Sequence, residues 1–481
     1  MEFYETAPSH DLTYSDVFLV PSHSEVASRL SVDLSPTDGT GATLPIVSAN
    51  MNSVTGPRLA ATLARRGALG VLPQDMHWQD LDAAIRWVKA QPISYDSPLS
   101  LRASDTVAAA RTQLPALHGH GHGVVVTDDA GGYLGVIAGE RLAGAMPQAP
   151  LGDLLAGAVT ALDADDVESP RAAFDLMVAA DLEFAPVLHH GAVIGTLSRK
   201  GALRSTLYAP ALDGSGRLRV AAAVGINGDV GAKAAALAAA GVDVIVIDTA
   251  HGHQAGMARA IASVAALKLG VPIVAGNVVT SAAVRDLVAA GADIIKVGVG
   301  PGAMCTTRMM TAVGRPQFSA VLETAATAAE LGAHVWADGG VRYPRDVALA
   351  LAAGAASVMI GSWFAGTTEA PGELRSDEQG RLYKESWGMA STKAVTERFE
   401  RLDPYELARK TLFAEGISSS KIYLDPLRPS VEDLLDMITA GLRSSFTYAG
   451  ASNLAEFSAR ALVGIQSAAG CEEGKALPVS W

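Results

Sequence analysis

Eight short apolar runs recur along this chain, and they limit the folds that it can adopt. They are rich in β-branched residues, and most of them lead into Gly, Asn or Asp. Continuous apolar runs of this length are typical of strands that are buried on both faces of a parallel sheet. The runs are LPIVSAN (44–50), GALGVLP (67–73), LRVAAAVGI (218–226), VDVIVIDTA (242–250), VPIVAGNV (271–278), ADIIKVGVG (292–300), HVWADGGV (334–341) and ASVMIGSWF (356–364).

Alanine-rich segments separate many of these runs. Three of these segments, 229–241, 280–291 and 344–354, end in glycine, as a helix with a left-handed C-terminal residue does. Strands that alternate with such helices predict an α/β fold, a (β/α)8 TIM barrel. A doubly wound open sheet is the alternative, and the eight regular repeats favour the barrel.

The regular spacing is interrupted once, between the second and third runs. Residues 93–208 follow another rhythm and are about the size of a small domain. They contain two similar halves, 107–142 and 170–203, and the pattern of each predicts helix, strand, turn, strand and helix. This weak internal repeat predicts a paired module inserted into a loop of the barrel, which residues 1–92 and 209–481 would form.

Three histidines lie at alternate positions in the first half, at His118, His120 and His122. Their spacing invites interpretation as a metal site. No cysteine or acidic cluster accompanies them, and a strand-like segment follows at once. A polar turn is therefore the favoured interpretation.

Charge and cysteine content narrow the classes of function. The formal net charge of −13 argues against a nucleic-acid-binding or anionic-membrane surface, but it allows a small phosphorylated ligand held by backbone amides. No apolar run approaches the about 20 residues that span a bilayer, and the acidic N-terminus lacks a signal-peptide pattern. Two cysteines, Cys305 and Cys471, cannot form a disulfide framework, so a cytoplasmic protein is expected.

Two glycine-containing loops point to a phosphate site. In a barrel of this kind, functional residues lie at the C-terminal ends of the strands. The seventh run leads into Asp338-Gly339-Gly340, and the eighth leads into Gly361-Ser362. Loops after the last two strands commonly bind phosphate through backbone amides, and the pair together favours that role over simple tight turns.

Cys305 follows the sixth run, within the glycine-rich segment GVGPGAMCTTR (298–308). A free cysteine is more often a small hydrophobic residue than a nucleophile, and that is our interpretation of Cys471. A glycine-rich loop, by contrast, presents amides and hydroxyls that stabilise a thiolate. Because the sequence lacks the pattern of a protease-like Cys/His pair, an electrophilic ring carbon is the better target for Cys305.

Four motifs together resemble the IMP dehydrogenase/GMP reductase family. They are LTYSDVFLVPS (12–22), GVGPGAMCTTR (298–308), ADGGVRYPRDVALALAAGA (337–355) and GSWFAGTTEAPGE (361–373). The resemblance covers nearly all of the barrel, and residues 93–208 lie where this family carries a tandem pair of CBS modules (a Bateman domain). It implies ATP or GTP as ligands of that pair, and a homotetramer or homo-octamer as the assembly.

The resemblance also assigns site residues. It implies that Cys305 attacks the purine C2 of a bound nucleoside monophosphate, with Thr307 beside it and Glu415 as general acid. It further implies Asn277 near the base and Gly388 and Met389 as substrate-binding residues. Asp338 is expected at the ribose hydroxyls, and Gly339, Gly340, Gly361 and Ser362 at the phosphate. Asp248, Arg443 and Ser444 are expected at a nicotinamide cofactor, and the carbonyls of Gly300, Gly302 and Cys305 around a monovalent cation such as K⁺.

Two departures from the family pattern stand out. Ala303 takes the place of a usual serine, which removes one phosphate-binding hydroxyl. Pro73-Gln74 replaces a His-Lys pair, which removes a lysine that the reductases use.

The two branches of the family differ in their second step. The dehydrogenases oxidise IMP to XMP with NAD⁺ and activate water with an Arg-Tyr pair on a mobile flap. The reductases use NADPH to convert GMP to IMP and ammonia. This chain has Arg398-Phe399 in that place, and phenylalanine has no hydroxyl, although Tyr405 stays open as another source.

Other stretches of the chain divide between the two branches. The segments SANM (48–51) and GMAS (388–391) and the tail 441–461 resemble the reductases, whereas the inserted module is typical of dehydrogenases. A dehydrogenase that kept the inserted module but lost the Arg-Tyr pair that activates water is harder to explain than a reductase that kept the module. The sequence therefore favours a GMP-reducing enzyme. The alternatives are an IMP dehydrogenase and a non-catalytic nucleotide sensor; the intact site residues argue against the sensor.

Overall fold

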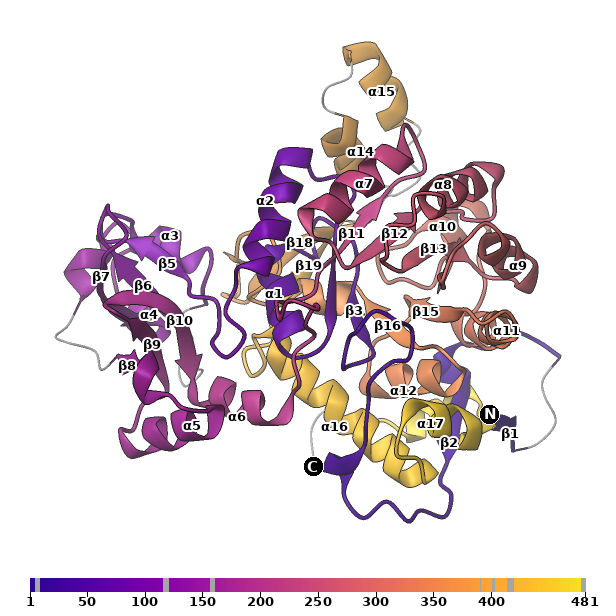
Figure 1. The fold of residues 1–481 in the computed structure, drawn as a ribbon, viewed down its shortest axis with the longest axis horizontal. Helices are drawn as coiled ribbons and strands as arrows, with labels where there is room; N and C mark the ends of the chain where they lie inside the picture. Colours follow the sequence, from indigo (N-terminus) through magenta and orange to yellow (C-terminus); the bar gives the residue numbers. More distant parts are fainter. Residues whose placement is uncertain are drawn as a thin grey trace.

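A computed structural model describes residues 1–4, 9–115, 121–155, 161–389, 391–399, 403–412 and 419–476. The eight apolar runs form a closed barrel of parallel strands in the order β11-β12-β13-β14-β15-β16-β3-β4 (Figure 1). Its strands are β3 (Ile46–Ser48), β4 (Leu69–Leu72), β11 (Ala221–Val224), β12 (Val244–Asp248), β13 (Ile273–Val278), β14 (Ile294–Val297), β15 (His334–Asp338) and β16 (Ser357–Ile360). Each predicted run contains one of these strands, so the predicted barrel is confirmed.

Helices surround the barrel and follow its strands (Figure 1). They are α1 (Pro57–Arg65), α2 (Trp78–Lys89), α7 (Val230–Ala240), α8 (Ala255–Ala265), α9 (Ser281–Ala289), α11 (Gln317–Glu330), α12 (Pro344–Ala352) and α16 (Val431–Ala449). Gly241 caps α7 with a φ of +101°. Gly291 and Gly354 take the same left-handed conformation one residue beyond the caps of α9 and α12. The glycine-terminated segments are therefore helices, as predicted.

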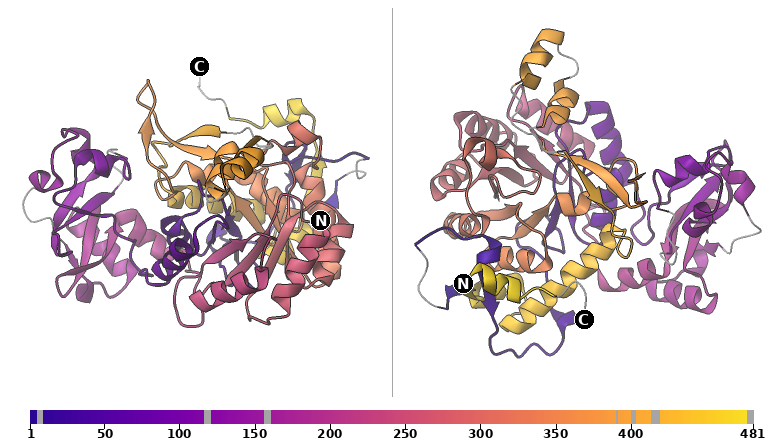
Figure 2. Two further views of the ribbon diagram at one scale, coloured as in Figure 1. Left: turned by 90° about the horizontal axis from the view of Figure 1, so that it is seen from above. Right: turned by 180° about the vertical axis from the view of Figure 1, so that it is seen from behind.

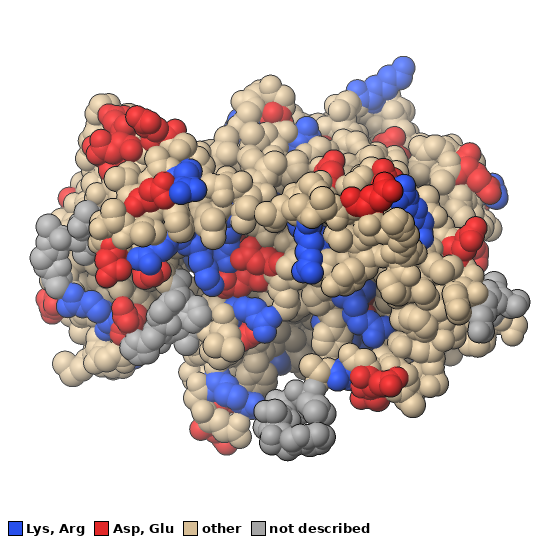
Figure 3. Space-filling model, turned by 90° about the horizontal axis from the view of Figure 1, so that it is seen from below, with Lys and Arg blue, Asp and Glu red and all other residues tan. Residues whose placement is uncertain are grey.

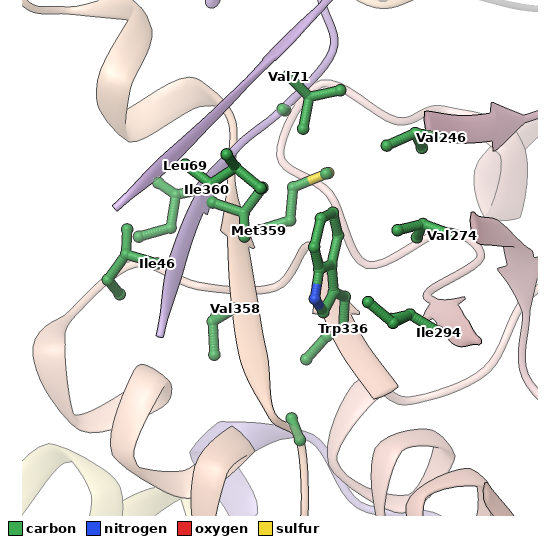
Figure 4. Close-up of a cluster of buried hydrophobic side chains, with 14 of the residues drawn as sticks. Ile46, Leu69, Val71, Val246, Val274, Ile294, Trp336, Val358, Met359 and Ile360 are labelled. Atoms are coloured by element: carbon green, nitrogen blue, oxygen red, sulfur yellow. The ribbon is translucent and has the colours of Figure 1, made fainter. Parts of the chain in front are cut away.

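Large apolar side chains fill the interior of the barrel. The indole of Trp336 is fully buried and lies between Val274, Ile294 and Met359 (Figure 4). Its N–H donates to Asp38 Oδ2 at 2.8 Å, so the one polar atom of this ring has a partner. Because side chains occupy the interior, a ligand can reach the strands only at their ends.

The inserted segment folds as two small three-stranded sheets. Each half has the predicted order of helix, strand, strand and helix, and a short parallel strand precedes it. The first half contains β5 (Ser100–Arg102), α3 (Val107–Arg111), β6 (Gly123–Thr127), β7 (Tyr133–Ala138) and α4 (Gly139–Ala143). The second contains β8 (Leu162–Asp163), α5 (Pro170–Ala179), β9 (Phe184–His189), β10 (Ala192–Ser198) and α6 (Arg199–Leu207). The assignment of these halves as CBS modules stays a prediction.

One of the three clustered histidines lies in the described part of the chain. The ring of His122 is 2.9 Å from the carbonyl oxygen of Pro115, a local contact. His118 and His120 fall outside the described residues. No group of His, Cys, Asp and Glu side chains that could hold a metal ion occurs among the residues that are described.

Two further small sheets and several helices complete the chain. Helices α14 and α15 project away from the body of the barrel (Figures 1 and 2). One sheet joins β1 (Glu2–Phe3), β20 (Leu462–Ile465) and β2 (Val17–Val20), and the other joins β17 (Arg375–Ser376), β18 (Leu382–Trp387) and β19 (Ser419–Tyr423). The remaining helices are α10 (Thr307–Thr311), α13 (Ser362–Ala365), α14 (Thr392–Phe399), α15 (Pro404–Leu412), α17 (Leu454–Arg460) and α18 (Ala468–Glu473).

Buried ion pairs fasten the inserted segment to the barrel. It lies to one side of the barrel in every view, beside α1 and α16 (Figures 1 and 2). Arg66, only 1% exposed, contacts Glu432 at 2.5 Å and Asp96 at 3.1 Å. Arg204 on α6 contacts Glu432 at 3.2 Å and Asp433 at 2.6 Å. Burial alone would raise the pKa of Glu432, but the charges of Arg66 and Arg204 and a hydrogen bond from Arg66 hold it below its ordinary value.

Replacement of Arg66 by methionine should destabilise the protein. The change leaves buried carboxylates without one of their cations, a loss that costs about 3–5 kcal/mol in comparable sites. We expect a clear fall in the thermal unfolding midpoint, measured by differential scanning calorimetry. The matched control is Arg171→Met, because Arg171 is 76% exposed in its pair with Asp175, and its midpoint should not change. Equal midpoints for both variants would contradict the prediction.

The surface carries charges of both signs. Acidic and basic side chains are interspersed over the face drawn in Figure 3, with no single basic tract across it. Among the described residues, no helix is both long enough and apolar enough to cross a membrane.

Candidate active site

A pocket of about 610 Å³ opens at the C-terminal ends of the barrel strands. Residues at or just beyond the ends of all eight strands line it, together with Gly388, Met389 and Arg398 from the segment after β18. Its size is that of a small-molecule site. The pocket therefore lies where the barrel architecture predicts functional residues.

The loop after β14 places a thiol in this pocket. Gly300 has a φ of +87°, and a Cβ atom there would lie 2.2 Å from Cγ of Arg308, so the loop requires glycine at this position. The N–H of Cys305 donates to the carbonyl of Gly302 at 2.9 Å. The thiol of Cys305 is exposed and lies 3.3 Å from Oγ1 of Thr307. A ligand in the pocket thus meets a free thiol with a hydroxyl group beside it.

Two further loops line the same pocket as the cysteine loop. Gly339 and Gly340 have φ angles of +95° and +82°. A Cβ atom on Gly339 would lie 3.0 Å from the backbone nitrogen of Gly302, so the turn after β15 packs directly against the cysteine loop. Gly361 and Ser362, after β16, line the same pocket. The two predicted phosphate loops are therefore neighbours.

A cluster of charged side chains occupies the floor of the pocket. Nζ of Lys296 lies 2.8 Å from Oδ1 of Asp248 and 2.7 Å from Oδ2 of Asp338. Asn277 donates to the same oxygen of Asp338 at 2.9 Å, and Asn50 donates to Oδ2 of Asp248 at 3.0 Å. One ammonium group therefore joins the carboxylates at the ends of β12 and β15.

Lys296 stays charged in this position. Its side chain is only 3% exposed, and burial by itself would lower the pKa of the amine. The charges of Asp248 and Asp338 outweigh burial and raise the pKa of Lys296 above its ordinary value. The cluster thus holds one cation and two carboxylate groups.

A second ion pair closes the side of the pocket. Arg398 on α14 makes two hydrogen bonds with the carboxylate of Asp75, at 2.7 and 2.8 Å, and it donates to the carbonyl of Met389 at 3.1 Å. Gln74 precedes Asp75, and its Oε1 is buried without a hydrogen-bond partner among the described residues. The fork of Arg398 thus joins the loop after β4 to the segment that follows β18.

The pocket brings together most of the predicted site residues. Those that line it are Asp248, Asn277, Gly300, Gly302, Cys305, Thr307, Asp338, Gly339, Gly340, Gly361, Ser362, Gly388 and Met389. Arg443 and Ser444 lie on α16, outside the described lining, where Arg443 donates to the carbonyl of Val32 at 2.6 Å and Ser444 to that of Ala440 at 2.9 Å. Glu415 lies outside the described residues. The roles of all these residues stay predictions.

Known proteins resemble the chain over almost its whole length. The family model of the IMP dehydrogenase / GMP reductase domain matches residues 11–476. The chain belongs to the IMP dehydrogenase/GMP reductase family. Curated GMP reductases from Mycobacterium tuberculosis and Mycobacterium bovis are 54% identical to it over 476 residues, which are 98% of this chain and 98% of each relative. The inosine-5'-monophosphate dehydrogenase of Aquifex aeolicus is 36% identical over 461 residues, or 94% of this chain and 92% of the relative.

A solved structure of this family is also similar. It is a cysteine-to-alanine variant of the GMP reductase from Trypanosoma brucei in complex with guanosine 5'-monophosphate. The TM-score is 0.69 at 30% identity, and the similarity covers 99% of each chain.

Sequence reasoning missed Lys296 as part of the site, and it missed that Arg398, which it placed on the flap, pairs with Asp75. The role of Lys296 could have been found from the sequence, because a lysine inside the apolar run ADIIKVGVG must have a buried partner. The contact of Asp75 could not, since nothing in the sequence of the loop after β4 indicates that it will meet α14. Resemblance to the family indicates where the pocket lies, but it does not predict these contacts.

Proposed function

We propose that the chain is a GMP reductase that converts GMP to IMP and ammonia with NADPH as the reductant. The observation that carries the proposal is the 54% identity to curated GMP reductases over 98% of both chains, against 36% for the dehydrogenase of Aquifex aeolicus. The exposed thiol of Cys305, with Thr307 beside it in the pocket, supports a covalent route. The expected place of action is the cytoplasm.

The reaction begins at Cys305. Its sulfur bonds to C2 of the purine, and the 2-amino group leaves as ammonia after Thr307 and Glu415 have supplied its proton. NADPH, when bound, supplies a hydride to C2. The C2–S bond then breaks, Cys305 leaves as a thiolate, and the products are IMP and NADP⁺. In total, GMP, NADPH and two protons give IMP, ammonium and NADP⁺, so atoms and charge balance.

The nucleotide is proposed to lie across the loops after β13, β15 and β16. The carboxylate of Asp338 accepts hydrogen bonds from the ribose hydroxyls, since charge-assisted bonds of this kind are the stronger ones. Backbone amides at Gly339, Gly340, Gly361 and Ser362 surround the phosphate, and Gly388 and Met389 lie at the base. Oδ1 of Asn277 is buried without a hydrogen-bond partner among the described residues, which suits a donor on the base.

The cofactor is proposed to occupy the other half of the pocket, beside Asp248. Oε1 of Gln74 lies there without a described partner, and an amide such as that of nicotinamide would satisfy it. Arg443 and Ser444 do not line the pocket of their own chain, so a role in cofactor binding requires a second copy, as the proposed homotetramer or homo-octamer provides.

Two other ligands belong to the proposal. The carbonyls of Gly300, Gly302 and Cys305 are proposed to hold a monovalent cation such as K⁺; the carbonyl of Gly302 already accepts one hydrogen bond and keeps a second lone pair. Residues 93–208, which contain the paired sheets, are proposed as CBS modules that bind ATP or GTP.

A spectrophotometric assay tests the proposal. The protein is incubated with GMP and NADPH, and separately with IMP and NAD⁺, while the nicotinamide absorbance is followed. We expect the absorbance to fall in the first mixture and to stay constant in the second. Oxidation of IMP would need Arg398 to help activate water, but the guanidinium group of Arg398 is already paired with the carboxylate of Asp75. A rise in the second mixture would identify an IMP dehydrogenase. No change in either, with GMP still bound, would leave a nucleotide sensor.

A further inference from the structure

The position of Lys296 at the centre of the pocket is built into the strands around it. Lys296 pairs in register with Gly276 on β13. A Cβ atom on Gly276 would lie 2.7 Å from Cβ of Lys296 and 2.3 Å from its carbonyl oxygen. Glycine at this position leaves room for the lysine between the two strands. The side chain then extends to the strand ends, where it reaches Asp248 and Asp338.

The two carboxylates depend on the same cation. Carboxylates that share one site cannot both ionise easily, and one of them takes up a proton or moves away unless a cation lies between them. Asn277 and Asn50 each donate one hydrogen bond to this cluster, but neither carries a charge. Nζ of Lys296 contacts both carboxylates, so the position of each depends on it.

We propose that Lys296 is a positioning residue that couples the nucleotide half of the pocket to the cofactor half. The inference rests on the proposed function, in which Asp338 holds the ribose hydroxyls of GMP and Asp248 lies beside the cofactor. Lys296 acts through these two carboxylates. It holds the two carboxylates at a fixed separation, so that Asp338 is placed to accept hydrogen bonds from GMP while Asp248 stays beside the cofactor.

The coupling predicts an unusual rescue. Lys296→Met leaves the carboxylates of Asp248 and Asp338 facing each other without a cation. We expect the Kd of GMP to rise about tenfold or more, the effect of losing one hydrogen bond to a charged group, because the carboxylate of Asp338 is then no longer held in place. The double variant Lys296→Met/Asp248→Asn removes the opposing charge as well. GMP binding should then return to within about threefold of the wild-type Kd, the size of a single modest contact, although the second change lies in the cofactor half.

Isothermal titration calorimetry with GMP alone measures these constants without turnover. Asp248→Asn by itself is the matched control, because it leaves Lys296 paired with Asp338, and its Kd should equal that of the wild type. Lys296→Arg keeps the charge and should bind GMP more tightly than Lys296→Met. If Lys296 served only the stability of the fold, its replacement would lower the melting temperature, and Asp248→Asn would not restore GMP binding.

The outcomes are distinct. Wild-type GMP affinity in Lys296→Met, or no recovery in the double variant, would overturn the coupling while leaving the proposed function intact. Should Lys296→Met fail to fold, the double variant carries the test, since it keeps the net charge of the cluster; a Kd more than about tenfold above the wild-type value would overturn the coupling. Failure of the wild-type protein to bind GMP would overturn the proposed function and this inference with it.

Discussion

Alanine at position 305 should abolish turnover of GMP while leaving GMP binding intact. Cys305 is the exposed thiol of the pocket, and the proposed route forms its covalent bond at this sulfur. Loss of a nucleophile that acts together with its proton-transfer partners costs about 10⁴-fold or more in kcat. Steady-state assays with GMP and NADPH measure kcat, and calorimetry measures the Kd of GMP, which should stay near its wild-type value.

The second cysteine provides the control for Cys305. Cys471 lies on α18, where its sulfur is 3.7 Å from an N–H of Arg345 and does not line the described pocket. Cys471→Ala should therefore leave kcat and KM unchanged. Full activity in Cys305→Ala would contradict the covalent route. Lost activity together with lost GMP binding would point instead to a collapsed pocket, and the melting temperature of the variant would reveal that.

The barrel could be predicted because the residues that specify each strand are neighbours in the sequence. Each strand is a continuous apolar run, and the residue types that end it, such as Asp338 and Gly361, are visible in the same few positions. The rule that active sites of such barrels lie at the C-terminal strand ends then places these residues in one pocket without knowledge of any contact. The halves of the inserted segment were visible for the same reason, since each repeats one short pattern.

Contacts between distant segments were not predictable. The salt bridges of Arg66 to Glu432 and of Arg398 to Asp75 join residues more than three hundred positions apart. No spacing or periodicity encodes them, because they depend on which surfaces come together after the barrel has closed. The sheet of β1, β20 and β2 is a further case, since it pairs the two ends of the chain.

The tail motif shows a different limit. Resemblance to the reductases assigned Arg443 and Ser444 to the cofactor, but in the single chain Arg443 holds carbonyl groups of the segment around Val32. A motif identifies residue types and their spacing along one chain. It does not say whether those residues serve the pocket of their own chain or that of another copy.

Replacement of Asp338 by asparagine should weaken GMP binding through the ribose. The carboxylate lines the pocket and is held by Lys296 and Asn277, so its free lone pairs are oriented before the nucleotide arrives. A hydrogen bond to a charged group contributes about 1.5–3 kcal/mol, which corresponds to a rise in the KM of GMP of about 10- to 150-fold. The value of kcat should fall much less, because Asp338 has no part in the proposed proton transfer.

A comparison of substrates makes this prediction specific. For the wild-type enzyme, 2'-deoxy-GMP should have a much higher KM than GMP, since it lacks one hydroxyl that Asp338 is proposed to bind. For Asp338→Asn the two substrates should have nearly equal KM values, because the contact is already lost. The control is Asp286→Asn, on the exposed surface of α9, where Asp286 is 67% exposed and pairs with His253. An undiminished preference for GMP in Asp338→Asn would show that another group recognises the ribose.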